Sequence, residues 1–167
     1  MPFYPGSTYD RQSRVAQLSQ SFDQVHAGSL VLYLVDRQFS VPISDFSAGN
    51  WTTQSGGTTN LFATLDETNR DDTDYIRSEQ TPTSSAVTLQ LTSLSTPNAG
   101  PQYLRYTYGK DAAGTINLTV ELLEGVSVTQ TWVHNDVPLG FFLASQQITN
   151  AISDYTNLRI RFTATQV

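Results

Sequence analysis

The chain has 167 residues, of which 38% are hydrophobic and 14% are charged, so it suits a single domain with a substantial core. Its formal net charge of −6 argues against a nucleic-acid partner, which requires a basic face to replace counterions. The absence of cysteine excludes disulfides, thiolate metal sites and cysteine nucleophiles, and a single lysine, Lys110, excludes a polybasic membrane patch.

Residues 1–28 differ from the rest of the chain and are predicted to form an N-terminal arm. Their irregular start lacks the apolar segment of a signal peptide, and no run in the chain approaches a membrane span of ~20 apolar residues. Apolar residues then recur at three- and four-residue steps, the spacing of a helical stripe. The stripe consists of Val15, Leu18, Phe22 and Val25. We expect either a short surface helix on the domain or an arm whose stripe contacts a neighbouring subunit.

Residues 29–167 are predicted to form a β domain. Residues 29–35 are a continuous apolar run of strand length, and residues 38–44 follow as an edge strand or bend, because their proline cannot donate to a ladder. Residues 47–60 have loop chemistry throughout and contain Trp51. Two interpretations of this tryptophan stay open: an exposed anchor for protein contact, or a side chain that folds back onto its own domain.

The C-terminal half shows strict alternation of apolar and polar residues. Alternating segments occur at 87–92, 104–108, 116–122, 126–132 and 158–164, and turn residues separate them at 95–101, 109–114, 124–125 and 134–136. A period of two predicts one buried and one wet face, as in an antiparallel sheet. The residues predicted to point inward are Leu89, Leu91, Leu118, Val120, Leu122, Ile160 and Phe162. The fold class predicted is therefore all-β, an antiparallel β-sandwich or jelly roll.

Carboxylates are densest at residues 66–76. The segment contains Asp66, Glu67, Asp71, Asp72 and Asp74. These oxygens are of the kind that calcium binds, but their spacing does not match an EF-hand loop. We favour consecutive turns in which the carboxylates accept backbone N–H groups, and we expect no metal or other cofactor.

The sequence offers no recognisable active site. Its two histidines, His26 and His134, are far apart, and no serine lies in a nucleophile-elbow context. A P-loop, a dinucleotide-binding motif and a metal-spaced histidine pair are also missing from the sequence. We therefore expect no enzymatic activity and assign no catalytic residue.

Three segments resemble, in order, small virion structural proteins of tailed bacteriophages. They are DDTDYI at 71–76, GTINLTVELLEG at 114–125 and ISDYTNLRIRF at 152–162. The resemblance covers residues 66–165, and its structural motifs are the pairs Asp74-Tyr75 and Asp154-Tyr155. It implies a β-sandwich with a virion role. We expect both aspartates to accept backbone hydrogen bonds and both tyrosines to be largely buried.

The expected function is that of a capsid decoration, or cement, protein on the outer surface of a tailed-phage head. The modest length, the arm and a polar, weakly charged surface favour it. Its partners would be the major capsid protein and sister subunits, in a homotrimer by analogy with other decoration proteins, and it would join the virion in the host bacterial cytoplasm. The alternative is a tail or fibre module that binds host-surface carbohydrate. Its stacking faces would be Trp51, Tyr103, Tyr106 and Tyr108.

Overall fold

The computed structural model describes residues 38–66, 71–97 and 100–167. Within this part, residues 39–167 form one compact unit. The predicted arm, its boundary at residue 28 and the apolar run at 29–35 lie outside the described residues and stay predictions.

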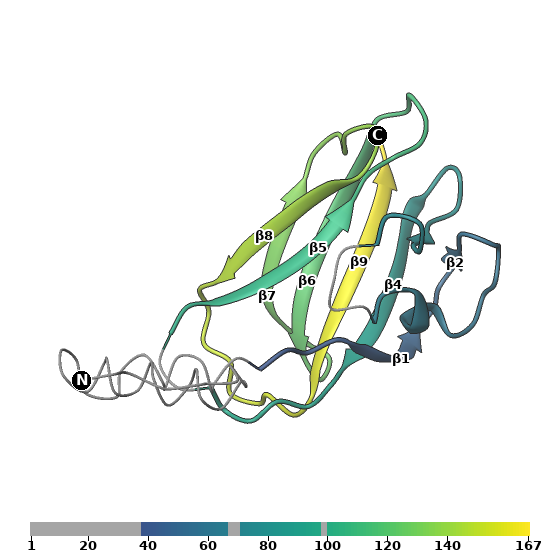
Figure 1. Cartoon of the computed structure of the whole chain (residues 1–167). Coiled ribbons are helices and arrows are strands. Elements are labelled where there is room, and N and C mark those ends of the chain that lie inside the picture. The colour runs from purple at the N-terminus through teal and green to yellow at the C-terminus, as the bar shows by residue number, and fades with distance from the viewer. Residues whose placement is uncertain (1–37, 67–70, 98–99) are drawn as a thin grey trace, which may run out of the picture. The chain divides into compact units, whose positions relative to one another are not determined.

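The larger layer of the domain is a five-stranded antiparallel sheet with the order β1-β4-β9-β6-β7 (Figure 1). Its strands are β1 (Pro42–Ser47), β4 (Thr83–Leu91), β6 (Ile116–Glu124), β7 (Ser127–His134) and β9 (Leu158–Gln166). The long strands β4, β6 and β9 are the alternating segments of the sequence, and β9 lies between the other two. Central strands with one buried face are the ones that alternation predicts best.

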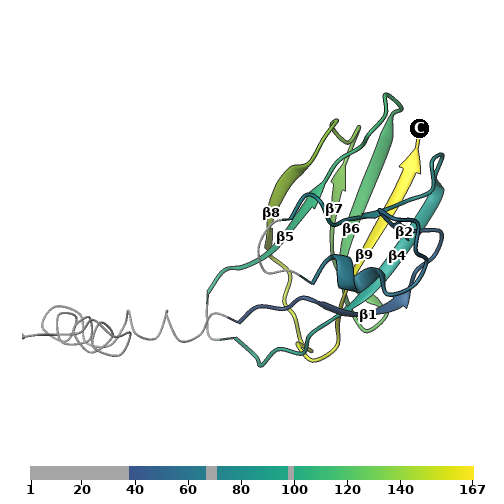
Figure 2. The same ribbon diagram turned by 45° about the vertical axis from the view of Figure 1, so that its right-hand side comes forward.

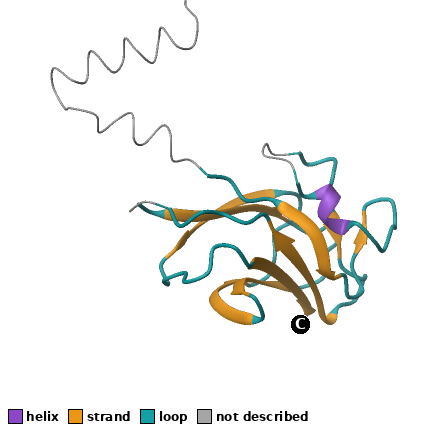
Figure 3. Cartoon of the chain, turned by 90° about the horizontal axis from the view of Figure 1, so that it is seen from below, coloured by secondary structure: helices purple, strands orange, loops and turns teal. Residues whose placement is uncertain are grey.

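A smaller layer covers part of the five-stranded sheet. Strands β5 (Gln102–Tyr108) and β8 (Phe142–Ile148) pair antiparallel and lie over one half of the large sheet (Figure 2). The other half is covered by a loop region with the short pair β2 (Thr52–Thr53) and β3 (Ile76–Arg77) and one 3-10 helix, η1 (Leu61–Thr64), the purple turn in Figure 3.

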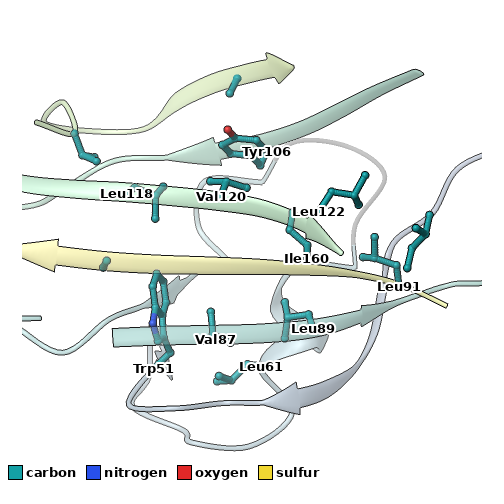
Figure 4. Packing of buried hydrophobic residues seen from close by; sticks show 14 residues of the cluster. Trp51, Leu61, Val87, Leu89, Leu91, Tyr106, Leu118, Val120, Leu122 and Ile160 are labelled. Carbon is teal, nitrogen blue, oxygen red and sulfur yellow. The ribbon is translucent and has the colours of Figure 1, made fainter. Parts of the chain in front are cut away.

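The core lies between these layers and is filled from both sides (Figure 4). Trp51 and Leu61 come from the loop region and pack on the β4 side, whereas Tyr106 comes from the small sheet. The buried set is Trp51, Leu61, Val87, Leu89, Leu91, Tyr106, Leu118, Val120, Leu122, Val137, Ala144, Leu158, Ile160 and Ala164. All residues predicted to point inward belong to it except Phe162, which packs against it half-buried.

The all-β, antiparallel sandwich is thus confirmed, but the jelly roll is not. A jelly roll has eight strands in two Greek keys, whereas the described residues form a five-stranded sheet faced by a two-stranded one. The difference arises at residues 47–65, where large apolar side chains of a loop and a 3-10 helix close the core in place of strands.

Strand β8 was not predicted. Its sequence, FLASQQI, begins with two adjacent large apolar residues, so the alternation of period two is lost. Phe142 and Leu143 are respectively 48% and 59% exposed. The inner face of β8 carries a small buried residue, Ala144, next to the exposed Phe142, so it has no strong apolar pattern to reveal the strand.

The edge strand β1 holds the 3-10 helix through one carboxylate. Asp45 accepts hydrogen bonds from the backbone N–H groups of Leu61, at 3.0 Å, and Phe62, at 2.9 Å. Two donors that the start of a helix leaves unpaired are therefore satisfied from a neighbouring strand. Leu61, which this contact positions, is completely buried.

We expect Asp45→Ala to lower the free energy of unfolding by about 0.5–2 kcal/mol, the usual cost of losing a helix-capping side chain. Asp45→Asn is the matched control, because its amide keeps one oxygen acceptor and should lose less. Urea unfolding followed by tryptophan fluorescence measures both. Equal stability of Asp45→Ala and the wild type would show that the two N–H groups do not depend on the carboxylate.

Candidate interaction surface

The four residues of the predicted stripe, Val15, Leu18, Phe22 and Val25, lie outside the described residues. Their role as a protein contact stays a prediction.

Trp51 lies inside its own domain. Its side chain is 7% exposed and belongs to the core. A tight turn directs the side chain inward, and in this turn the backbone N–H of Trp51 donates to the Ala48 carbonyl at 3.1 Å. Gly49, with φ +55°, passes so close to β4 that a side chain there would overlap the Ala86 carbonyl. The indole is therefore not an exposed anchor, and the second interpretation of this residue holds. Its Nε1 donor is buried with no hydrogen-bond partner among the described residues.

The second Asp-Tyr pair is a structural turn. Asp154 Oδ1 accepts from the N–H of Thr156, at 2.9 Å, and from its hydroxyl, at 2.6 Å. These two bonds hold the pKa of Asp154 below its usual value, and the bond from the Thr156 hydroxyl has the larger effect. The backbone hydrogen bond expected of Asp154 is confirmed. Tyr155 is half-buried at the margin of the core, less than expected, and its hydroxyl accepts a hydrogen bond from Gln102 at 2.7 Å.

The first Asp-Tyr pair differs from the expectation. The aspartate that forms the turn is Asp71, whose Oδ1 accepts from the N–H and the hydroxyl of Thr73 at 2.8 and 2.7 Å. Asp74 accepts no backbone hydrogen bond from the described part of the chain. Tyr75 is half-buried, and its ring lies 5.3 Å from that of Phe141. The spacing Asp-x-Thr, which Asp154 and Thr156 share, was the signal for the turn.

A run of exposed apolar side chains lies beside Tyr75. Residues 139–143, here called the apolar strip, contain four large side chains that are each more than a third exposed. They are Leu139 (61%), Phe141 (38%), Phe142 (48%) and Leu143 (59%). Single exposed apolar residues are ordinary, but consecutive ones mark surfaces that other molecules cover. The sequence showed this run, yet burial could not be judged without the fold.

The apolar strip is held rigidly through Lys110, the only lysine of the chain. Its backbone N–H donates to Pro138 and its carbonyl accepts from Gly140, at 2.9 and 3.0 Å. Its ammonium group bonds the Asp136 carboxylate at 2.5 Å and the Gly114 carbonyl at 2.8 Å. Lys110 thus ties the start of the strip to Asp136 and Pro138, which precede it in the chain, and to Gly114. A preorganised surface loses little conformational entropy when a partner binds.

The tyrosines predicted as carbohydrate-stacking faces do not share one surface. Because successive residues of a strand point to opposite faces, Tyr103 lies on one side of β5 and Tyr106 and Tyr108 on the other. Tyr103 is 51% exposed, whereas Tyr106 is part of the core. Tyr108 is half-buried and stacks on His134, with 4.1 Å between the ring centroids.

A shallow hollow of about 490 Å³ lies at the other end of β7, next to Glu124. It is lined by Glu124, Ser127, Val128, Thr129, Asn150, Ala151 and Ser153. The Glu124 carboxylate accepts hydrogen bonds from Ser153, Asp154 and Thr129. These bonds lower the pKa of Glu124, and the bond from the Ser153 hydroxyl has the largest effect. The carboxylate therefore fastens Ser153 and Asp154 to the β6–β7 hairpin.

Neither a metal centre nor a membrane helix is found in the described ranges. No three His, Asp or Glu side chains there are grouped to hold a metal ion. The same residues include no helix with the length and apolar character that a membrane crossing demands.

Comparison of the chain with family models, with characterised proteins and with solved structures finds no match.

Proposed function

We propose that this chain is a non-catalytic virion structural protein that decorates the outer surface of a tailed-phage head. The observation that carries the proposal is the apolar strip at residues 139–143, four exposed large side chains on a preorganised segment. Such a surface is costly in water unless another protein covers it. Its partners are then the major capsid protein and sister subunits, in a homotrimer.

The charged groups of the domain support a structural role. Lys110 pairs with Asp136, and Arg161 pairs with Glu121 at 2.6 Å on the outer face of the large sheet. Glu124 receives several hydrogen bonds from neighbouring loops. These side chains hold turns and strands together, which suits a protein that works by presenting a fixed surface.

The resemblance of the three segments to phage virion proteins supports the virion setting. The alternative, a carbohydrate-binding tail or fibre module, has less support because two of its four stacking faces, Trp51 and Tyr106, lie in the core. Tyr103 remains as a well-exposed ring. A single exposed ring is a small platform for a sugar.

The test is binding to particles that lack this protein. We expect the double variant Leu139→Ser, Leu143→Ser to bind such particles at less than about a tenth of wild-type occupancy, because losing two buried apolar contacts costs ~1.5–3 kcal/mol each. The matched control is Val126→Ser, Val133→Ser, whose side chains are 76% and 57% exposed on the β6–β7 hairpin and outer face. Quantitative gel densitometry of sedimented particles gives the occupancy, and thermal melting verifies folding.

Wild-type occupancy of the strip variant would refute attachment through residues 139–143. Deletion of residues 1–25 then tests the predicted arm separately: loss of binding in that variant alone would place the attachment in the arm. Binding by neither the wild type nor the control, together with retention on an immobilised host polysaccharide, would favour the carbohydrate alternative.

A further inference from the structure

The outer face of the small sheet is regular and open to solvent. Strands β5 and β8 (Figure 1) pair along their whole length without a register shift. Because successive side chains of a strand alternate between its two faces, every second residue of each strand points away from the core. These residues are Tyr103, Arg105 and Thr107 of β5 and Leu143, Ser145 and Gln147 of β8. All of them are exposed except Thr107, which is half-buried.

The six residues form three cross-strand pairs. Tyr103 lies opposite Gln147, Arg105 opposite Ser145, and Thr107 opposite Leu143. The side chains of directly opposite residues are neighbours, with about 5 Å between their Cβ atoms. Arg105 therefore lies in the middle of this face, between an aromatic ring and a leucine. Leu143 also belongs to the apolar strip, so the face and the strip form one continuous surface.

Arg105 is a positive charge without a partner inside the molecule. The sequences of the two strands, QYLRYTY and FLASQQI, contain no other charged residue. Within the described part of the chain, the guanidinium of Arg105 has neither a carboxylate partner nor a hydrogen-bond acceptor. The formal net charge of the whole chain is −6, so this face is a local site of positive charge on an acidic protein.

The outer face of the large sheet treats its arginines differently. There, Arg161 pairs with Glu121 at 2.6 Å. Arg159 donates to the Gln90 side chain at 2.8 Å and to the Gly125 carbonyl at 2.9 Å. These two cations are satisfied within the chain, whereas the five N–H donors of Arg105 are open to another molecule. The contrast favours the small sheet as the face that a partner covers.

The chemistry of this face specifies the kind of partner. The planar fork of an arginine matches a carboxylate, which it binds through two parallel hydrogen bonds. Tyrosine and arginine are also the residues that most often dominate protein–protein binding, and surrounding contacts that exclude water strengthen a charged pair.

We infer that the outer face of the small sheet, together with the apolar strip, is the attachment surface of this protein. The shell protein of the particle presents an aspartate or glutamate carboxylate to Arg105, and apolar side chains beside that carboxylate meet Tyr103 and Leu143. The inference rests on the proposed function, because the partner that it describes is the phage shell.

The test is the affinity of the full chain for particles that lack it, from sedimentation isotherms at about 50 and about 300 mM NaCl. We expect Arg105→Gln to bind at least ~10-fold more weakly than the wild type at the lower salt concentration, and Arg105→Glu more weakly still, because a like charge then faces the carboxylate. Arg105→Lys should recover part of the affinity, since it restores the charge without the fork. Added salt should weaken the wild type more than Arg105→Gln.

The matched control is Arg161→Gln, which removes the same charge from the outer face of the large sheet. It should bind particles like the wild type, because that face lies on the other side of the sandwich. Thermal melting verifies that each variant is folded. Arg105 is exposed and makes no internal contact, so we expect its variants to melt like the wild type.

Several results would overturn the inference. Undiminished binding of Arg105→Glu to particles that the wild type binds would remove the carboxylate contact and leave the proposed function standing. Equal losses in Arg105→Gln and Arg161→Gln would show that net charge matters rather than position. No binding by the wild type would overturn the inference and the proposed function together. In that case, Arg105-dependent retention on an acidic host polysaccharide would assign the face to a sugar, and Arg105-dependent self-association would assign it to a second copy.

Discussion

Gly109→Ala is expected to lower the free energy of unfolding by about 3 kcal/mol, at the upper end of overpacking substitutions. A methyl group at residue 109 would overlap the carbonyl of Gly140, with its carbon only 2.6 Å away and the Phe141 Cα at 3.3 Å. The obstacle is backbone rather than the end of a flexible side chain. Relief therefore requires the two chain segments to separate.

The hydrogen bonds around Gly109 oppose that separation. Lys110 donates to Pro138 and accepts from Gly140, so the backbone segments are joined on both sides of the would-be methyl group. Moving them apart breaks two hydrogen bonds and displaces the start of the apolar strip. We therefore expect Gly109→Ala to impair particle binding along with stability.

Gly100→Ala is the matched control, because a Cβ there meets nothing within 4 Å and the backbone is not left-handed. It should be neutral or slightly stabilising, since alanine restricts the unfolded chain more than glycine. Urea denaturation of both variants gives the comparison. Equal stability of the two variants would show that the 109–110 and 138–141 segments are free to move apart.

Much of the large sheet could be predicted from the sequence, because burial on one face imposes a period of two. Leu89, Val120 and Ile160 are examples, since each is flanked by polar residues and each lies in the core. Leu123 breaks the pattern: it is 2% exposed although it follows the inward-facing Leu122. Leu123 lies opposite Arg159 of β9 and Val128 of β7, on the face away from Leu122, and is not part of the core cluster, so its burial on the outer face is one that alternation cannot reveal.

The candidate sites were harder to predict because they depend on contacts between distant segments. Whether Trp51 faced solvent or the core was decided by a turn at Gly49 that packs on β4. The pairing of Tyr106 with His134 joins two different sheets, and no sequence spacing specifies which strands face each other. The apolar strip could be recognised in the sequence as a run of large apolar residues, but only the fold shows that its side chains are exposed.

Leu122→Ala is expected to cost about 2–5 kcal/mol, the range for truncating a buried leucine. Leu122 is 2% exposed and lies opposite Ile160 of the central strand, which in turn lies opposite Leu89 of β4. These three side chains form one row across the sheet on its inner face. Truncating one of them leaves a cavity that the regular backbone pairing on both sides cannot close.

Val128→Ala is the control for Leu122→Ala, because it removes apolar atoms from the same hairpin at a side chain that is 46% exposed. We expect a change within about 0.5–1 kcal/mol there, since solvent already reaches the site. Chemical denaturation with an unchanged slope would assign the difference to the folded state rather than to the unfolded one. Losses of equal size at Leu122 and Val128 would contradict a core that lies between the two layers, because the outer-face residue would then matter as much as the inner one.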